Sequence, residues 1–399
     1  MALVSFFRAS SSQSAQPLCY NSKMFLKSIA ACEFRNLKGE INWEHGLNIL
    51  FGNNGQGKTN WLEAIYLLAH ARSFRTSRFN ELIRFGESCA AVQGTVTRGS
   101  GVERHLEVSI HGNTKRTLVN GKREPISRYA AQLHAVCFTS DELQVVRGGP
   151  EARRTFLDRG VVSLHPPLAQ TLSDYSKVIA QKRRLLRQSA EDQTIRAGLA
   201  DLLEPWNQQL ISLSAQIHRA RTDYVALLND MLEHSLFSDN ISIRYLSSLE
   251  SKGDLDDYEG LISRHLQARM QAEMFAGACL VGPHRDDLNI LFGGRDLRSF
   301  GSSGQQRSAL ITLDLAAISV YNSKHQDYPI FLIDDVDAEL DGNRIERLLE
   351  YLEGRSQTFL TTSKRSHFDR FSRRASFYEV NAGIAKDEKE LSAAIAAAN

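Results

Sequence analysis

A glycine-rich segment that ends in lysine and threonine is the first feature of this sequence able to do chemistry. Gly52-Asn-Asn-Gly-Gln-Gly-Lys58-Thr59 fits the pattern G-x-x-x-x-G-K-[ST] between a short apolar run and a helical pattern. Such glycines let the chain curl so that its N–H groups point at phosphate oxygens, and the helix adds its positive end. We expect Lys58 to contact the β- and γ-phosphates and the Thr59 hydroxyl to ligate Mg²⁺. The candidate phosphate-binding residues are Gly52, Asn53, Asn54, Gly55, Gln56, Gly57, Lys58, Thr59 and Asn60.

Two adjacent carboxylates follow an apolar segment much later in the chain. Ile330-Phe-Leu-Ile-Asp334-Asp335 indicates a buried strand that ends in acid. A phosphate-binding loop needs a carboxylate on a neighbouring strand to hold its metal, so we assign Asp334 to the Mg²⁺ side, directly or through water. Asp335 is then placed to orient the attacking water, which makes it the candidate catalytic residue. The alternative is a pair that only caps the next loop.

A Ser-x-Gly-Gln turn opens a helical pattern shortly before the acidic strand. The turn is Ser302-Ser303-Gly304-Gln305, and ALITLDLAAI follows it after a short polar stretch. This turn resembles the signature motif of ABC-type ATPases, a resemblance that implies contact with a γ-phosphate held by a partner subunit. A simple helix N-cap would account for one serine but not for the Gly-Gln pair.

Two further segments resemble parts of the same ATPases. Ala338-Glu-Leu-Asp341 resembles the D-loop, with Asp341 at its end. In QTFLTTS, Thr362 occupies the position of the switch histidine, so the γ-phosphate sensor stays undetermined. Lys58 and Asp334 are 276 residues apart. A transporter ATPase subunit has a much shorter spacing and long-armed chromosome-organising ATPases a much longer one, so a short helical arm fits here.

The elements that must position these groups can be predicted from the apolar patterns. Residues 24–37 and 46–51 favour strands on either side of a polar turn, and residues 89–123 favour a β-meander with a tight hairpin at Asn120-Gly121. Residues 168–275 are helical in pattern, with Pro205 expected in the first turn of a helix. An apolar seam with alternating gaps of three and four is typical of an antiparallel helix pair or an amphipathic core helix. The seam residues are Leu210, Leu213, Ile217, Ala220, Tyr224, Leu227 and Met231.

These patterns predict an α/β fold, an ABC-type P-loop ATPase head with an inserted, mainly helical arm domain. We place the head at residues 24–147 and 278–385, the arm at 148–277 and a C-terminal tail at 386–399. Residues 1–23 are serine-rich and acid-free, which indicates a disordered or non-native extension, with a transit peptide as the alternative.

Composition excludes some classes of protein. The chain has 399 residues and 42% of them are apolar, so it can bury a core. It contains no run of ~18 apolar residues, the length that a membrane-spanning helix needs. Its 48 Lys and Arg against 46 Asp and Glu give a net charge of only +2. An odd number of widely spaced cysteines favours reduced thiols in a cytoplasmic protein. The cysteines are Cys19, Cys32, Cys89, Cys137 and Cys279.

Taken in order, several segments make the chain similar to the RecF family of ABC-type DNA repair ATPases. They are Phe34-Arg-Asn-Leu37, the P-loop, and residues 72–78, 138–143, 149–158 and 281–288, followed by the signature and the acidic strand. The segment His284-Arg-Asp-Asp287 is the most distinctive. Ser303 and Ala338 stand where the family favours Gln and Ser, and neither departure removes a phosphate ligand.

The resemblance implies an ATP-dependent homodimer that clamps double-stranded DNA at gapped junctions. It also implies that RecO and RecR are partners in loading RecA onto single-stranded gaps, and that weak, DNA-stimulated ATP hydrolysis resets the dimer. ATP and Mg²⁺ are the implied cofactors, and Arg35, Asn36 and Arg75 are implied to lie near the nucleotide. The alternatives are another ABC/SMC-like ATPase acting on DNA, a transporter ATPase subunit, and a P-loop kinase or small-molecule enzyme.

Local charge agrees with a DNA partner. Residues 147–187 carry nine bases and three acids, and phosphate neutralisation is what such clusters do well. A solvated helix face is the alternative for Lys182–Arg187. By contrast, residues 238–259 carry six acids and two bases, which favours a loop or a contact with a mediator protein. The DNA-binding candidates are Arg72, Arg78, Lys182, Arg183, Arg184 and Arg187.

Overall fold

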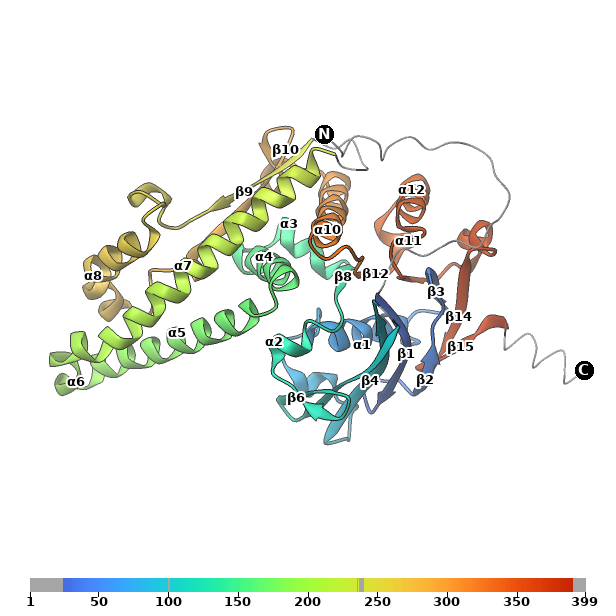
Figure 1. The fold of residues 1–399 in the computed structure, drawn as a ribbon, viewed down its shortest axis with the longest axis horizontal. Coiled ribbons are helices and arrows are strands. Elements are labelled where there is room, and N and C mark those ends of the chain that lie inside the picture. Colours follow the sequence, from blue (N-terminus) through green and yellow to red (C-terminus); the bar gives the residue numbers. More distant parts are fainter. Residues whose placement is uncertain (1–23, 100, 235, 237–239, 390–399) are drawn as a thin grey trace, which may run out of the picture.

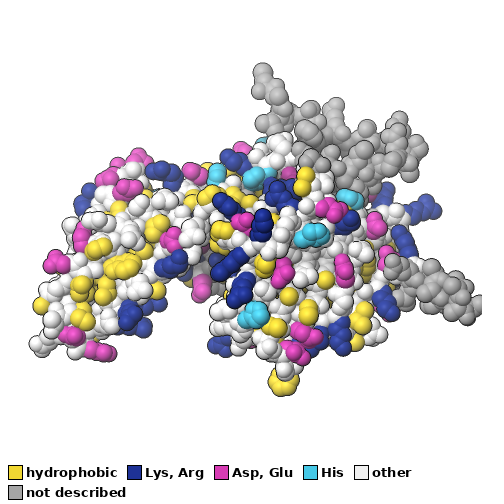
Figure 2. Space-filling view, turned by 60° about the horizontal axis from the view of Figure 1, so that its bottom comes forward, with side chains coloured by type: hydrophobic (Ala, Val, Ile, Leu, Met, Phe, Trp, Pro, Cys, Tyr) yellow, Lys and Arg dark blue, Asp and Glu magenta, His cyan; other side chains and the backbone are white. Residues whose placement is uncertain are grey.

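The computed structural model describes residues 24–99, 101–234, 236 and 240–389 (Figure 1). The expected extension 1–23 and the end of the expected tail, 390–399, lie outside this range. A head of two sheets and an arm of long helices make up the molecule (Figure 1). An open notch separates the arm from the head, and Lys and Arg side chains lie on both sides of it (Figure 2). The predicted fold class is therefore confirmed.

The central sheet of the head is mostly parallel. Only the edge strand β15 runs antiparallel to its neighbour, β14. Alternation along β12 sends Phe331 and Ile333 to the cluster around α10, and Ile330 and Leu332 to the cluster around α1. Burial on both faces explains why this strand is a continuous apolar run. In spatial order the strands are β15 (Ile384–Asp387), β14 (Ala375–Asn381), β3 (Leu47–Phe51), β13 (Thr358–Thr362), β12 (Ile330–Ile333) and β8 (Ala135–Phe138).

A second, antiparallel sheet packs against α1 (Lys58–His70). Gly94 is needed in it because a Cβ there would lie 2.5 Å from Leu68 of α1. Asn120 and Gly121 both have positive φ, 51° and 74°, so the predicted tight hairpin is confirmed. In order the strands are β2 (Gly39–Asn42), β1 (Met24–Cys32), β4 (Cys89–Arg98), β5 (Val102–His111), β6 (Thr114–Val119) and β7 (Lys122–Arg123).

The arm is a helical hairpin joined to a third helix. Tyr175 of α5, Leu210 of α7 and Leu261 of α8 belong to one apolar cluster, so the predicted helix pair is confirmed. Pro205 lies inside α7 rather than in its first turn, because the helix begins at Leu199. The helices are α4 (Pro150–Leu164), α5 (Leu168–Glu191), α6 (Gln193–Ala197), α7 (Leu199–Leu232) and α8 (Tyr258–Ala276).

Apolar packing and strand pairing cross the expected domain boundaries. Phe156 of α4 and Leu228 of α7 pack in the head cluster with α10 (Ser303–His325). The arm strand β9 (Ile241–Leu246) pairs with β10 (Asp287–Phe292), which lies past residue 278 and pairs in turn with β11 (Arg295–Asp296). At the other end, Lys386 and Asp387 complete β15, so the head sheet extends into the expected tail.

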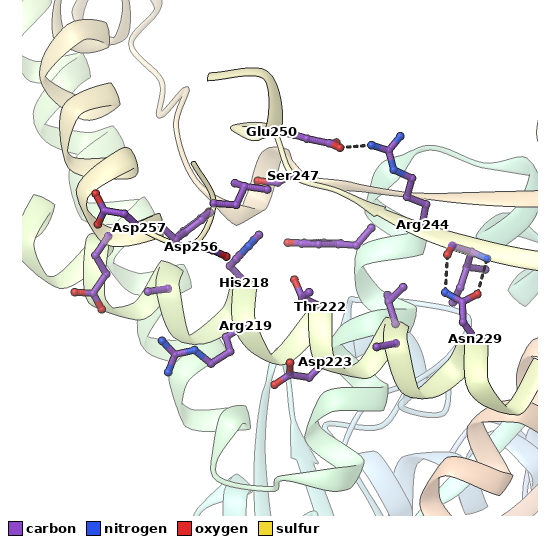
Figure 3. Close-up of a pocket in the computed structure, with 18 residues that line it drawn as sticks. His218, Arg219, Thr222, Asp223, Asn229, Arg244, Ser247, Glu250, Asp256 and Asp257 are labelled. Atoms are coloured by element: carbon purple, nitrogen blue, oxygen red, sulfur yellow. Dashed lines mark hydrogen bonds and ion pairs between the residues drawn. The ribbon is translucent and has the colours of Figure 1, made fainter. Parts of the chain in front are cut away.

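Short elements complete the described part of the chain. None of the described helices is long and apolar enough to cross a membrane. Between α7, β9 and the start of α8, the arm holds a hollow lined by both polar and apolar side chains (Figure 3). The remaining elements are η1 (Phe79–Leu82), α2 (Ile126–Tyr129), η2 (Asp141–Leu143), α3 (Gln144–Arg147), η3 (Glu250–Lys252), η4 (Pro283–Arg285), α9 (Leu297–Phe300), α11 (Val336–Glu339), α12 (Gly342–Leu352) and η5 (Arg365–Phe371).

The distinctive segment 284–287 is the joint between arm and head. His284 Nδ1 lies 2.6 Å from the Tyr175 hydroxyl of α5. Asp286 accepts from the Tyr245 hydroxyl at 2.5 Å and from a backbone N–H at 2.7 Å. Asp287 binds both Nε and Nη2 of Arg153 at 2.6 and 2.9 Å. These buried and half-buried polar pairs fix one geometry, because each lost partner would leave a desolvated group unsatisfied.

Candidate nucleotide site

The glycine-rich loop follows β3 and leads directly into α1. Gly52, Gly55 and Gly57 have φ of 145°, 78° and 111°, values at which any side chain is strained. A Cβ on Gly52 would lie 2.5 Å from the Val380 carbonyl oxygen of β14. The loop therefore has room only for glycine at its packed positions. The loop runs directly into the N-terminus of α1, so its backbone N–H groups and those of the helix can face the same phosphate.

Lys58 holds its ammonium group over the same loop. Its Nζ donates to the carbonyl oxygens of Gly52 at 2.7 Å and of Asn53 at 2.9 Å. Burial lowers the pKa of Lys58, and the nearby carboxylates of Asp335 and Asp334 act in the opposite direction. A partly desolvated cation beside a helix N-terminus is suited to an anion such as a phosphate.

The carboxyl ends of three neighbouring strands bring the metal candidates together. The Asp334 Oδ1, after β12, accepts from the Thr59 hydroxyl at 2.9 Å and from the Thr361 hydroxyl of β13 at 2.7 Å. Burial raises the pKa of Asp334, and these two hydroxyl donors oppose that shift. The sequence interpretation missed Thr361, although it stands directly before Thr362 in the same strand.

This donor set fits Mg²⁺ bound together with a phosphate. Mg²⁺ keeps several waters and takes one or two protein ligands plus phosphate oxygens. The described part of the chain contains no group of three or more His, Cys, Asp or Glu that could hold a metal by itself. A cation between Thr59 and Asp334 would thus need phosphate oxygens or waters to complete its coordination, and it would favour the ionised form of Asp334.

Asp335 differs from its neighbour in conformation and exposure. Its φ is 45°, in the left-handed region, and its N–H donates to the Thr361 hydroxyl at 2.7 Å. Although it holds the N-cap position of α11, its side chain makes no capping bond there, so the capping alternative gains no support. The exposed carboxylate is left available beside the phosphate-binding loop.

The Thr362 hydroxyl is engaged by neighbouring residues. It donates to Asp337, and the N–H of Lys364 donates to it at 2.9 Å. His367 Nδ1 lies 3.2 Å from the other oxygen of Asp337. The sequence interpretation named neither Asp337 nor His367, because nothing in the linear spacing marks the approach of η5 to α11.

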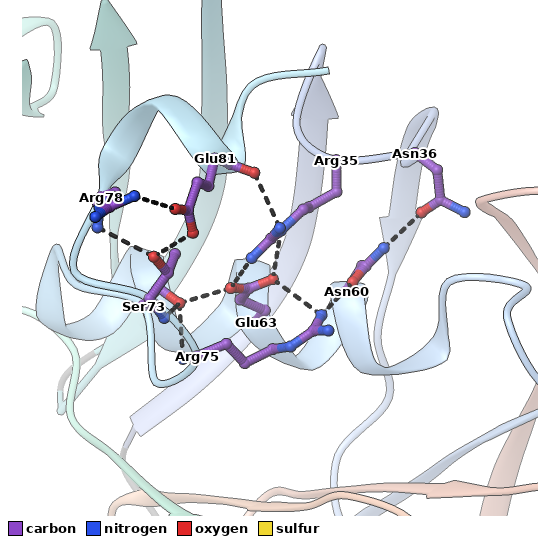
Figure 4. Close-up of polar contacts among 9 residues, drawn as sticks. Arg35, Asn36, Asn60, Glu63, Ser73, Arg75, Arg78 and Glu81 are labelled. Atoms are coloured by element: carbon purple, nitrogen blue, oxygen red, sulfur yellow. Dashed lines mark hydrogen bonds and ion pairs between the residues drawn. The ribbon is translucent and has the colours of Figure 1, made fainter. Parts of the chain in front are cut away.

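A buried carboxylate holds two of the three residues implied to lie near the nucleotide, and the third, Asn36, is linked to them through Asn60 (Figure 4). Glu63 of α1 is completely buried and binds Nε and Nη2 of Arg35 at 3.0 and 2.9 Å. Arg75 Nη1 lies 3.7 Å from the same carboxylate and donates to Asn60 Oδ1 at 3.0 Å. Asn60 also donates to Asn36 Oδ1 at 2.7 Å. The sequence interpretation missed Glu63, which reads as one polar residue in an apolar helix.

The signature residues form the N-terminus of α10. The Ser302 hydroxyl accepts from the Gln305 N–H at 3.3 Å, and the Gln305 side chain accepts from the Ser302 N–H at 2.8 Å. This capping box gives Gln305 a local role that the sequence interpretation did not foresee. Ser302, Ser303 and Gly304 are exposed, so the same end of the helix is open to another molecule.

Asp341, the D-loop candidate, is the N-cap of α12. Its carboxylate accepts from the Arg344 N–H at 3.0 Å, and Asp341 is exposed. The side chains of Ala338 and Glu339, in the same predicted loop, lie outside what the structure describes.

The predicted DNA-binding cluster is only partly at the surface. Lys182 was wrongly included, because it is 1% exposed and its Nζ lies 2.8 Å from Glu273 of α8. In the same basic run, Arg153 is buried against Asp287, and Arg159 binds Glu142. Charge counting failed here because sequence does not show which bases have buried partners. The candidates that remain exposed are Arg72, Arg78, Arg183, Arg184 and Arg187.

A P-loop beside an acidic strand, a capped Ser-x-Gly-Gln helix and an inserted arm define an ATPase head of the ABC and SMC class. A family sequence model described as "RecF/RecN/SMC N terminal domain" matches residues 25–386. The chain belongs to this family, and within it to the RecF proteins.

Relatives and solved structures support this assignment. The DNA replication and repair protein RecF of Ruminiclostridium cellulolyticum is 35% identical over 373 residues, which cover 90% of this chain and 98% of that protein. The RecF protein of Geobacillus thermodenitrificans is 35% identical over 85% of this chain and 93% of its own length. The solved structure of the recombination mediator protein RecF with ATP has a TM-score of 0.81 at 29% identity, covering 92% of this chain and 99% of that one. A Pyrococcus furiosus Smc head, with a TM-score of 0.51 at 14% identity over 94% of this chain and all of that one, shares the fold.

Proposed function

We propose that this chain binds ATP with Mg²⁺ and hydrolyses it slowly, and that it acts as an ATP-dependent double-stranded DNA-binding protein in recombinational DNA repair and replication. The observation that carries the nucleotide part is the meeting of Thr59, Asp334 and Thr361 at the mouth of the loop that contains Lys58. The relatives named above are DNA replication and repair proteins, which supports the process.

Each residue at this site has a chemical role in the proposal. Lys58 and the N-terminus of α1 hold the β- and γ-phosphates, where they offset negative charge. Thr59 and Asp334 hold Mg²⁺, which neutralises charge on the same phosphates. Asp335 orients the attacking water and accepts its proton. Glu63 holds Arg35 and Arg75, and Arg75 sets the position of Asn60 beside the phosphates.

A second copy of the chain completes the site in this proposal. Residues 302–304 are exposed at the N-terminus of α10, where N–H groups and the helix dipole favour a phosphate. Phe300 is 75% exposed just before them, and aromatic residues are enriched in protein–protein interfaces. The partner's signature helix would then approach the γ-phosphate held by the first copy.

Double-stranded DNA and gapped junctions are the proposed nucleic-acid partners, with RecO and RecR as protein partners in RecA loading. The exposed candidates Arg72, Arg78, Arg183, Arg184 and Arg187 support DNA contact, because guanidinium groups neutralise phosphates. The four cysteines in the described residues are unpaired, in keeping with a reducing compartment such as the cytoplasm.

Sedimentation and hydrolysis with and without duplex DNA test this proposal. The wild-type chain should double its mass with Mg²⁺ and ATP, and duplex DNA should raise the hydrolysis rate. Lys58→Ala should abolish the ATP-dependent melting shift, which at 100 Kd of ligand corresponds to ~2.7 kcal/mol. Lys122→Ala, on an exposed hairpin strand, is the matched control and should behave as wild type. A melting shift that survives Lys58→Ala would refute the nucleotide site.

A further inference from the structure

The arm contains a hollow of about 740 Å³ that the nucleotide site does not use. It lies between α7, β9 and the segment that leads into α8, and residues of all three line it (Figure 3). Its volume is within the usual range of ~300–1,000 Å³ for ligand sites. Residues 243–259, which make up most of the acidic segment, contribute much of one wall.

Carboxylates outnumber cations in this hollow. Arg244 is paired with Glu250, and Arg219 is the other cation in the lining. In the described residues, no ion pair neutralises Asp223, Asp256 or Glu259. These three unpaired carboxylates create a negative potential that attracts cations and repels nucleic-acid phosphates. The five lining carboxylates are Asp223, Glu250, Asp256, Asp257 and Glu259.

A buried histidine in the lining lacks a hydrogen-bond partner. His218 is 9% exposed, and within the described part of the chain its Nδ1 has no partner. The ring extends from α7 into the hollow and stacks on Tyr258, with centroids 4.0 Å apart (Figure 3). Burial lowers the pKa of His218, which favours the neutral ring with one accepting nitrogen. The Nδ1 atom is buried in this conformation, so a rotation of the ring must bring it to an incoming N–H donor, which would then satisfy a group that is costly to leave unpaired.

Apolar side chains in the same hollow suit the stem of a long cationic side chain. Val225, Ile243 and Leu255 line it beside the carboxylates. Arg and Lys combine an aliphatic stem with a charged donor group, and so match such a mixed surface. A free polyamine carries the same positive charge, but it lacks the neighbouring apolar side chains that a peptide segment can provide.

We propose that this hollow docks a basic, partly apolar segment of a partner protein and takes an arginine or lysine side chain beside His218. The site lies at the root of the arm. On another face of α7, Tyr224 and Leu228 pack in the head cluster with α10. A bound partner would thus contact a helix that also supports the signature end of the head. This inference does not depend on ATP or DNA binding.

Fluorescence anisotropy with the full-length chain tests the proposal. The probe is a labelled peptide of alternating arginine and leucine, and its glutamate–leucine counterpart is the charge control. The triple variant Asp223→Asn/Asp256→Asn/Glu259→Gln should bind the arginine peptide about tenfold more weakly at 0.15 M salt. His218→Phe keeps an aromatic ring against Tyr258 but removes the acceptor, and should weaken binding about threefold. Asp230→Asn, exposed on α7 outside the hollow, is the matched control.

Three outcomes would overturn the docking site. The triple variant could bind the peptide as wild type does, or Asp230→Asn could weaken binding equally. Spermidine could also compete with the same residue dependence and an affinity equal to that of the peptide, which would make the hollow a polyamine site. ATP hydrolysis and duplex-DNA binding should stay at wild-type level in the triple variant, so failure of this proposal is distinguishable from failure of the proposed function.

Discussion

The Thr361 hydroxyl gives two adjacent carboxylates different environments. It donates to Asp334 and accepts from the Asp335 N–H, so Asp334 is drawn toward Thr59 while Asp335 adopts a left-handed backbone. A residue held at positive φ without being glycine costs free energy, and such positions are common at functional sites. The sequence predicted both carboxylates from their place after an apolar strand, but not the hydroxyl that separates their roles.

Asp335→Asn should preserve ATP binding and slow hydrolysis by about 10²–10⁴-fold, because an amide cannot accept the proton of water. The measurements are single-turnover hydrolysis and the ATP-dependent melting shift. Asp254→Asn, an exposed acid in the arm, should change neither value. Wild-type turnover in Asp335→Asn would mean that another group orients the water.

Glu63→Gln should raise the KM for ATP several-fold and leave kcat nearly unchanged. The amide cannot hold both guanidinium groups, so Arg75 should loosen its contact with Asn60 beside the P-loop. A buried hydrogen bond between charged groups contributes ~1.5–3 kcal/mol, and urea unfolding should show a loss of this order.

Glu63→Asp separates positioning from simple stability, because it keeps the charge on a shorter stem. We expect it to recover part of the KM and part of the unfolding free energy. If Glu63→Gln unfolds more easily but its KM stays at the wild-type value, Glu63 supports the fold and does not position the nucleotide.

At the scale of elements, local sequence patterns predicted the helices and strands better than they predicted which elements pack together. The apolar run of β12 and the Asn120-Gly121 hairpin were predictable because period and turn chemistry act over a few residues. The seam of α7 was predicted as one face, yet Tyr224 packs in the head cluster and Leu227 is 41% exposed. A 34-residue helix passes from arm to head, and no local pattern marks where its environment changes.

The same limit explains the error at Lys182. In sequence it lies in a run of bases, but its position on α5 turns it toward Glu273 of α8. Their pairing spans 91 residues of chain, so only tertiary structure reveals it. The exposed neighbours Arg183 and Arg184 are on the solvent side of the same turn.

Lys182→Met should lower the free energy of unfolding by ~3–5 kcal/mol, because it leaves a buried carboxylate unpaired. Adding Glu273→Gln should recover much of this loss, since the amide keeps the 2.7 Å bond from the Leu280 N–H without the charge. Arg183→Met is the exposed control and should change stability by less than ~0.5 kcal/mol. Urea unfolding measures all three, and equal stability of Lys182→Met and wild type would contradict the buried ion pair.

At the scale of the whole molecule, one chain provides only part of the proposed ATP site. Lys58, Thr59, Asp334 and Asp335 come together within it, whereas Ser302 and Gln305 satisfy each other in a capping box at the exposed end of α10. The sequence predicted every one of these residues from its motif. It could not show whether the signature turn serves its own helix, a second chain, or both.

Ser302→Arg distinguishes these roles when it is compared with Ser302→Ala. Both substitutions remove the side-chain cap, which costs ~1 kcal/mol of stability. Only arginine adds bulk and charge to the surface that should meet the partner copy. We therefore expect Ser302→Ala to dimerise with ATP and Ser302→Arg to remain monomeric, while both retain the ATP-dependent melting shift.

The consequence should extend to DNA, because a dimer joins the exposed arginines of two chains in one binding surface. On duplex DNA, log K falls by ~0.9 per neutralised phosphate for each decade of salt. Ser302→Arg should therefore bind duplex DNA with an ATP-independent affinity and a shallower salt slope than wild type or Ser302→Ala. Sedimentation with ATP and DNA titrations at several salt concentrations measure both effects. If Ser302→Arg dimerises and keeps the wild-type slope, the Ser-x-Gly-Gln turn is only a helix cap and the ATP site does not need a second chain.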